Sequence, residues 1–270
     1  MFDVMLPRAD RGRYAARMTT TKREMESAIE VFVHGYSTDR SRTFPYEASR
    51  VGPLWLMRDG ARKNPRDCRS EEWVVHDVAP QAADVIVRQH ARSSFAVSVV
   101  MANEEPDRPT RTAYKELGYR LLRTEGFFLQ RLRRIPSPQA AILIERVRTT
   151  ERAAQLGKIM RKRPIADNLL RDGAPFRQYV AIDGDDIVGR VRSVDAMGAT
   201  WCSDMYVDPS HRRRGIGRAL LSKMLRDDRA RGSRCSVLAA TQAGALLYPG
   251  MGYEQIGTLL IFGPKKQASK

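Results

Sequence analysis

The 270-residue sequence predicts an α/β fold of the α+β type, with a mixed, largely antiparallel sheet flanked by helices and built from two tandem units. Three observations support this fold class. The C-terminal half alternates extended apolar segments with amphipathic helical ones. A glycine-rich loop joins one of these strands to the helix that follows it. A Tyr-x-x-x-Gly-Tyr motif occurs once in each half, which indicates an internal repeat.

The C-terminal unit begins after the boundary at 133–138, where two prolines and a serine cannot continue a helix or a central strand. Its predicted elements are, in order, a strand over 141–147, a helix over 150–162, strands over 178–182 and 187–194, and a strand over 200–207. We expect Thr150 to be the N-cap of the helix and Pro164 to end it. The residues expected on its inward face are Ala154, Ile159 and Met160. Asp183-Gly184 is a hairpin turn sequence.

The most informative segment is the loop between the strand that ends at Val207 and the next helix. Its sequence over 212–217 is Arg-Arg-Arg-Gly-Ile-Gly. Two glycines spaced two apart allow a tight turn and let the backbone approach a ligand closely. The first amides of the helix have no intrahelical partner and carry partial positive charge. The loop therefore predicts a site for a phosphate or pyrophosphate, around which the arginines add charge-assisted donors.

This loop resembles the acetyl-CoA loop of the GNAT-type N-acetyltransferases, whose pattern Arg/Gln-x-x-Gly-x-Gly/Ala is met by Arg212, Gly215 and Gly217. A second family element follows in the expected order, because Tyr248 with Gly252-Tyr253 resembles the family's Tyr-x-x-x-Gly-Phe ending. The resemblance covers roughly 140–263 and implies a GNAT-like fold that binds acetyl-CoA. The cofactor-binding residues that it implies are Met205, Tyr206, Val207, Arg212, Arg213, Arg214, Gly215, Ile216, Gly217, Arg218 and Thr241.

The N-terminal half repeats part of this pattern. In both 114–119 and 248–253 the motif lies between an apolar strand and a longer strand. We also match the apolar segment 28–33 with the strand at 141–147. No glycine loop precedes the first motif, and 80–90 is expected to form an ordinary helix. The predicted division is a mobile basic tail over 1–25, a degenerate GNAT-like domain without a CoA loop over 26–134, and a catalytic GNAT domain over 139–265.

Composition narrows the class of protein. The net charge of +16 comes from basic residues spread over the whole chain without interleaved aromatics, so we do not expect nucleic acid as a partner. No apolar run approaches the roughly 20 residues of a membrane span, and 1–20 lacks the apolar core of a signal peptide. Cys68, Cys202 and Cys235 are too few and too scattered for a disulfide framework or a metal site. A reducing cytoplasm is the expected compartment.

Acetyl transfer to an amine requires a base that removes a proton from the amine and an acid that protonates the departing thiolate. Tyr248 occupies the position at which the family carries that acid. The sequence does not decide between three candidates for the base. Asp204 precedes the strand segment beside the loop, Glu145 lies in the first strand of the unit, and His211 adjoins the loop. Thr241 is expected either to hydrogen-bond the CoA arm or to cap the next helix.

The leading functional prediction is an acetyl-CoA-dependent N-acetyltransferase that acts on a primary amine of a small molecule or a protein. Two alternatives stay open. One is a non-catalytic module that senses CoA or mediates an interaction, and the other is an acyltransferase that acts on an RNA or ribosomal substrate. The expected partners are acetyl-CoA and an amine, with no membrane and no metal. We expect a monomer that is a pseudo-dimer of its two halves, or a homodimer.

Overall fold

The computed structural model describes residues 20–103, 106–138 and 140–265. The N-terminal half contains, in chain order, α1 (Lys22–Arg40), β1 (Tyr46–Val51), β2 (Leu54–Asp59), the short 3-10 helix η1 (Pro65–Asp67), β3 (Glu71–Val75), α2 (Pro80–His90), β4 (Phe95–Ala102), α3 (Asp107–Glu116) and β5 (Tyr119–Gln130). The C-terminal half contains β6 (Leu143–Arg146), α4 (Thr150–Met160), α5 (Asp167–Leu170), β7 (Phe176–Asp183), β8 (Asp186–Ala196), β9 (Ala199–Val207), η2 (Pro209–His211), α6 (Ile216–Ala230), β10 (Ser236–Ala240), α7 (Gln242–Ala245), η3 (Pro249–Met251) and β11 (Glu254–Pro264).

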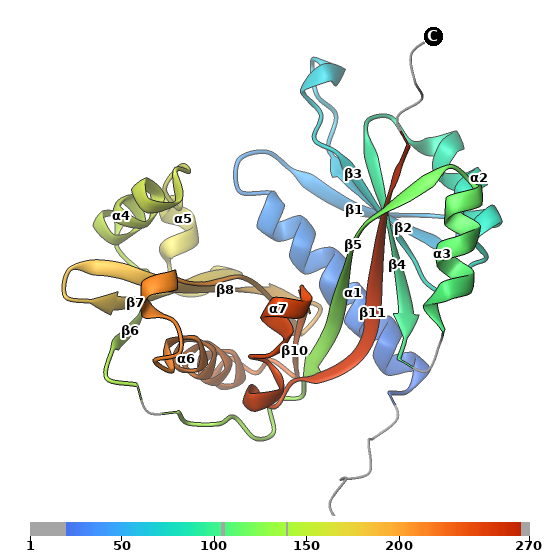
Figure 1. Ribbon diagram of the computed structural model, residues 1–270. Coiled ribbons are helices and arrows are strands. Elements are labelled where there is room, and N and C mark those ends of the chain that lie inside the picture. Colours follow the sequence, from blue (N-terminus) through green and yellow to red (C-terminus); the bar gives the residue numbers. More distant parts are fainter. Residues whose placement is uncertain (1–19, 104–105, 139, 266–270) are drawn as a thin grey trace, which may run out of the picture.

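These strands form one continuous sheet of eleven strands in the order β1-β2-β3-β4-β11-β5-β10-β9-β8-β7-β6 (Figure 1). Two neighbouring pairs are parallel, β3 with β4 and β9 with β10, and the other neighbours are antiparallel. A helix connects the strands of each parallel pair, α2 in the first case and α6 in the second, as a parallel crossover requires. The predicted mixed, largely antiparallel sheet flanked by helices is confirmed.

The last strand of each half is inserted into the sheet of the other half. β5 lies between β10 and β11, with Phe127 opposite Ala239, and β11 lies between β4 and β5, with Leu260 opposite Val99. Figure 1 shows these two long strands side by side at the centre of the molecule. The division into 26–134 and 139–265 remains a proposal, because each of these segments completes its sheet only with a strand from the other.

Helices cover both faces of the sheet. On one face α1, α4 and α5 pack over a core that extends through both halves, and α1 contacts β1 and β2 as well as β8, β9 and β10 (Figure 1). A side chain at Gly35 would overlap Trp201, so this glycine lets α1 lie close to β9. On the other face, α6 and α7 cover the C-terminal half, and α2 and α3 cover the N-terminal half. Among the residues that the structure describes, no helix combines the length and hydropathy of a membrane-spanning segment.

Three local predictions need correction. The segment 28–33 lies inside α1 and is not a strand, because Thr21 caps a helix whose buried positions recur at helical spacing; its match with the strand at 141–147 is therefore wrong. The cap of α4 is Thr149, whose side chain accepts a hydrogen bond from the Arg152 amide at 3.2 Å, and not Thr150. Of the residues predicted on the inward face of α4, Met160 packs against the core, whereas Ile159 is 49% exposed; the buried residues of the helix are Ala153, Leu156 and Gly157. Residues 1–19 of the predicted tail lie outside the described residues, and 22–25 form the first turn of α1.

Candidate functional site

The sheet opens where β9 and β10 diverge. The two strands pair only at Thr200 with Ser236 and at Trp201 with Val237, although β9 continues to Val207 and β10 to Ala240. The register between β8 and β9 shifts in the same region, and Asp204 has a φ of +53°, so β9 carries a bulge there. The bulge bends β9 away from its parallel neighbour. Beyond Trp201 the β9 backbone therefore has no strand partner on the β10 side.

The loop after β9 presents the amino end of α6 to this opening. Gly215 is the N-cap of α6 with a left-handed φ of +79°, a conformation that favours glycine. Because glycine has no side chain, no side-chain oxygen accepts a hydrogen bond from the first amides of the helix. The first intrahelical bond runs from the Ala219 amide to the Gly215 carbonyl at 3.0 Å. The amides at 216–218 consequently have no intrahelical acceptor and are available to an anionic ligand.

A cavity of about 630 Å³ lies against these amides. One wall is the strand end at 205–207 together with the loop, and the opposite wall is the segment from Ala243 to Tyr248. An ideal Cβ placed on Gly217 would lie 3.0 Å from Met205 Cε and 3.3 Å from Leu247 Cδ2, so a larger residue at 217 would reduce the cavity. The two motifs that the sequence singles out thus face each other across one cavity, whose volume suits a cofactor-sized ligand.

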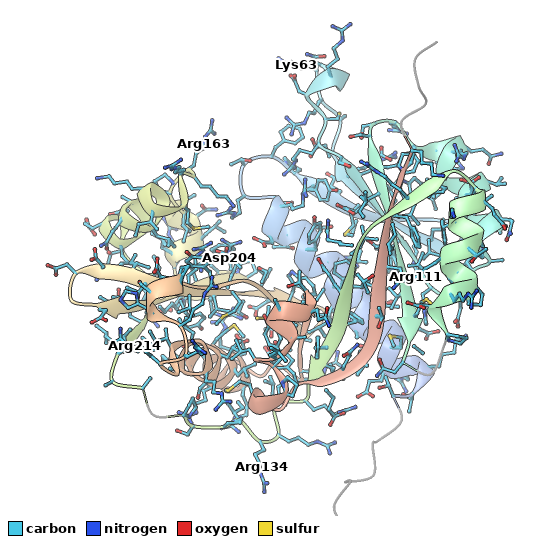
Figure 2. The ribbon with its side chains drawn as sticks, in the orientation of Figure 1. Lys63, Arg111, Arg134, Arg163, Asp204 and Arg214 are labelled. Atoms are coloured by element: carbon cyan, nitrogen blue, oxygen red, sulfur yellow. The ribbon has the colours of Figure 1, made fainter. Side chains whose placement is uncertain are left out.

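The arginines of the loop have different roles. Arg212, Arg213 and Arg218 line the cavity, and Arg212 Nε also donates to the Val207 carbonyl at 3.0 Å, which fixes the loop against the strand. Arg214 lies outside the lining, and its guanidinium contacts Asp183 at 3.2 Å; Figure 2 shows it beside the start of α6. Among the described residues, no carboxylate forms an ion pair with the three lining arginines, so their charge remains available to a ligand.

Tyr248 closes the cavity opposite the loop. Its side chain is 6% exposed, and its ring packs at 5.7 Å from that of Phe128 and at 5.6 Å from that of Tyr253, measured between ring centroids. The Met251 amide donates to the Tyr248 carbonyl at 2.9 Å, which holds the short 3-10 turn that positions the ring. Burial, with a smaller effect from Cys202, raises the pKa of Tyr248 above its ordinary value. The phenol therefore remains a proton donor at neutral pH.

The structure separates the three candidate bases. Asp204 lies outside the cavity lining, and its carboxylate accepts hydrogen bonds from Arg190 Nε and Arg192 Nη2, both at 3.1 Å. Glu145 lies on the edge strand β6 and accepts from Arg152 Nε at 2.7 Å, also outside the lining. Of the three, His211 lines the cavity, with its Nδ1 2.7 Å from Ser210 Oγ and its Nε2 3.5 Å from Asp183.

Thr241 lies at the N-cap of α7, is exposed, and makes no side-chain bond to that helix. It lies outside the cavity lining, whereas its neighbours Ala243 and Gly244, together with Leu247, form that wall. Sequence reasoning did not single out these three residues. The available indication was their position between the end of β10 and Tyr248, on the segment that must return past the loop.

Comparison with known proteins agrees with this geometry. Residues 175–255 match the family of acetyltransferase (GNAT) domains. No curated protein matches the chain. Its fold is similar to that of a GCN5-related N-acetyltransferase from Kribbella flavida, with a TM-score of 0.63 and 15% identity over 89% of this chain and 96% of that one. A GCN5-related N-acetyltransferase from Sphaerobacter thermophilus is similar with a TM-score of 0.52 and 17% identity over 88% and 92% of the two chains. At these identities the likeness is one of fold.

Proposed function

We propose that this chain, which belongs to the GNAT superfamily through its acetyltransferase domain at 175–255, transfers the acetyl group of acetyl-CoA to a primary amine of a small molecule or a protein. One observation carries the proposal. A single cavity of about 630 Å³ contains both the unpaired amides at the start of α6 and the ring of Tyr248. The cavity thus combines a wall suited to the phosphates of CoA with a buried donor for the proton that the departing thiolate needs.

The residues present fit CoA. The amides at 216–218 and the guanidinium groups of Arg213 and Arg218 would hold its phosphates. Gly215 supplies the left-handed turn, and Gly217 leaves the space that a side chain would fill. The β9 backbone at 205–207 has no partner on the β10 side and would bond the amide-containing arm, as a free sheet edge does with an extended ligand.

Acetyl-CoA supplies a thioester whose acyl group is transferred and whose thiolate departs. Tyr248 is proposed to donate its phenolic proton to that thiolate, because its hydroxyl stays protonated and its ring is held against the cavity. The pairing of Asp204 and Glu145 with arginine does not favour either as the base. His211 is the candidate that lines the cavity. Much of the rate should come from holding the amine and the acyl donor together.

The test is thiol release from acetyl-CoA by the full chain across a panel of primary amines. We expect turnover with one class of amine, and Tyr248→Phe should lower kcat by roughly 10²–10⁴-fold with CoA affinity nearly unchanged. Tyr114→Phe is a matched control, because Tyr114 is the equivalent first tyrosine of the Tyr-x-x-x-Gly-Tyr motif in the N-terminal half, is likewise buried and lies outside the cavity. CoA binding without turnover on any amine would favour the non-catalytic CoA-sensing alternative.

A further inference from the structure

A second cavity, of about 510 Å³, lies on the face of the sheet covered by α1. We call it the basic cavity. Its walls come from both halves: the loop at 42–44 after α1, Arg62 after β2, and the segment 162–166 after α4 together with Leu169 of α5. The cationic residues of its lining are Arg42, Arg62, Lys162 and Arg163, and the lining contains no carboxylate. Figure 2 shows Arg163 on the segment after α4, beside the space between α4 and the loop after α1.

The charge of the basic cavity is not neutralised by its surroundings. Arg42 reaches Asp39 only at 4.0 Å, and the same carboxylate oxygen accepts a hydrogen bond from Arg192 at 2.7 Å. Burial and the neighbouring Arg192 guanidinium lower the pKa of Arg42 more than Asp39 and Asp204 raise it. Lys162 and Arg163 are exposed and form no ion pair with any described residue.

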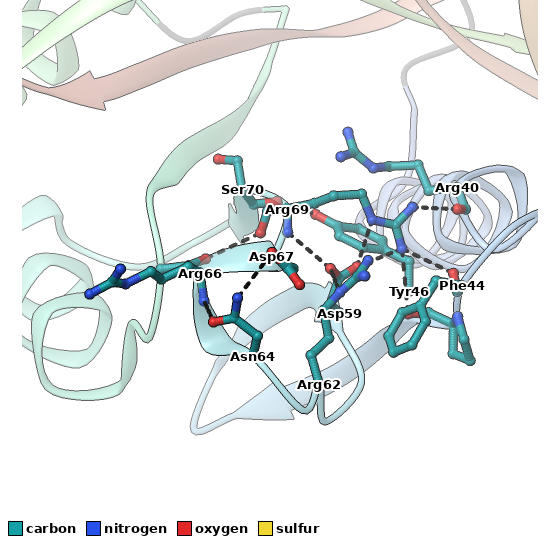
Figure 3. Close-up of polar contacts among 12 residues, drawn as sticks. Arg40, Phe44, Tyr46, Asp59, Arg62, Asn64, Arg66, Asp67, Arg69 and Ser70 are labelled. Carbon is teal, nitrogen blue, oxygen red and sulfur yellow. Dashed lines mark hydrogen bonds and ion pairs between the residues drawn. The ribbon is translucent and has the colours of Figure 1, made fainter. Parts of the chain in front are cut away.

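The N-terminal wall of the basic cavity is held rigidly. Figure 3 shows Arg69 donating to the main-chain carbonyls of Arg40, at 2.6 Å, and Phe44, at 3.0 Å, which fixes both ends of the loop that carries Arg42. Asp59, buried beneath the loop, accepts hydrogen bonds from both Arg69 and Arg62 at 2.6 Å. One carboxylate therefore serves two guanidinium groups, and a net positive charge remains. Arg62 also stacks on the Phe44 ring, with its Cζ 3.8 Å from the centroid.

A chain of contacts connects the basic cavity with the opening between β9 and β10. From Arg42 it runs through Asp39 to Arg192, whose guanidinium contacts the Asp204 carboxylate at 3.1 Å. Asp204 lies on the bulge at which β9 leaves β10, and Figure 2 shows it between the sheet and α1. A molecule in the basic cavity would thus lie on the face of the sheet opposite α6 and the proposed CoA cavity, connected to this opening through three successive ion pairs.

We propose that the basic cavity binds an oxyanion of the acceptor, so that the acceptor is an amine that also carries a phosphate or carboxylate group. This inference rests on the proposed function for the role of the bound molecule. Guanidinium groups bind such oxyanions through paired, charge-assisted hydrogen bonds, and that of Arg62 is already oriented by Asp59 and the Phe44 ring. The volume of about 510 Å³ suits a small metabolite or the side chain of a modified residue.

The test is calorimetric titration of the full chain with O-phosphoethanolamine, β-alanine and ethanolamine. We expect binding of at least one of the two anionic amines and none of ethanolamine; which of the two binds identifies phosphate or carboxylate as the group recognised. The double variant Lys162→Gln/Arg163→Gln should weaken this binding about 10²-fold, because each of the two charged hydrogen bonds contributes about tenfold. The control Lys158→Gln/Arg161→Gln removes the same charge from neighbouring exposed positions outside the lining and should leave the affinity within about twofold.

The proposal would be overturned if neither anionic amine bound, or if the cavity variant and the control lost the same affinity for the amine. It would also be overturned if a short RNA oligonucleotide bound tightly at the cationic residues of the basic cavity while neither amine did. Gly217→Val separates the two cavities, since it should leave O-phosphoethanolamine or β-alanine affinity unchanged. Loss of that affinity in Gly217→Val would place the anion at α6 and also contradict the proposal. If CoA binding and turnover are absent while anion binding still depends on Lys162 and Arg163, the proposed acetyltransferase function fails and the anion site stands.

Discussion

The replacement Gly217→Val tests the anion-binding wall of the CoA cavity most directly. An ideal Cβ at this position already lies 3.0 Å from Met205 Cε and 3.3 Å from Leu247 Cδ2, so the two further methyl groups of valine must enter the cavity. They would cover the amides at the start of α6. Losing two amide–phosphate hydrogen bonds at roughly 1.5–3 kcal/mol each removes about 3 kcal/mol or more of binding free energy. Affinity for CoA should then fall by about 10²-fold or more.

The assay is calorimetric titration of CoA into the wild-type chain and three variants. Gly217→Ala should be intermediate, because its single Cβ needs only a small shift of the Met205 and Leu247 side chains. Lys223→Val places the same β-branched residue on an exposed position of α6, away from the cavity, and should bind like wild type. Valine is a better helix former than glycine, so Gly217→Val should keep its thermal stability. A Gly217→Val affinity within about threefold of wild type would refute the assignment of this cavity to CoA.

Three further predictions concern the remainder of the molecule. The chain should bind one CoA, because the N-terminal half has no glycine loop; a calorimetric stoichiometry of two would contradict this. Asp228→Ala should lower the free energy of unfolding by about 3–5 kcal/mol in urea denaturation, because Arg177, 2.9 Å away and equally unexposed, then keeps only the partly exposed Asp195 as a charged partner. Asp227→Ala, which removes a partly exposed carboxylate that pairs with Lys223, should cost less than about 1 kcal/mol. Glu72 faces Tyr36, Arg40, Arg123 and Glu125, and burial raises the pKa of its carboxyl group. The protonated carboxyl therefore contributes to stability at acidic pH, and this contribution is lost as the pH rises through the pKa that Glu72 has in the folded state. Glu72→Gln should therefore stabilise the chain near pH 7 and have little effect near pH 4; equal thermal shifts at both would show that the carboxyl does not titrate with folding.

The local features of the site could be predicted from the sequence, because short-range chemistry determines them. A left-handed turn before a helix favours glycine, and the spacing of Gly215 and Gly217 therefore indicated both the turn and the free amides. The strand before the loop and the helix after it also agree with their apolar patterns. The same reasoning placed Thr150 at a cap that Thr149 occupies, because two adjacent threonines are equivalent in sequence and the backbone of the first turn decides between them.

The role expected for Asp204 shows where such reasoning ends. Its position one residue before Met205 suggested a base near the loop, but the bulge in β9 turns it toward α1, where Arg190 and Arg192 hold it. A bulge depends on the pairing register with β8, which a single strand's sequence does not specify. The order of the strands in the sheet likewise depends on contacts between segments that are far apart in the sequence. β5 and β11 have similar patterns, and nothing within either one states that its neighbours belong to the other half.

The exchange of β5 and β11 also restricts how the molecule can move. In two-domain enzymes with a hinge, a ligand is admitted when the domains rotate relative to each other. Here such a rotation would have to break backbone ladders on both sides of β5 and of β11, each a run of hydrogen bonds in the middle of the sheet. Access to the two cavities must therefore come from side chains and surface segments, while the frame between them stays fixed. For the same reason a cut at the linker near 134–139 would not yield two folding units, but two sheets that each lack an internal strand.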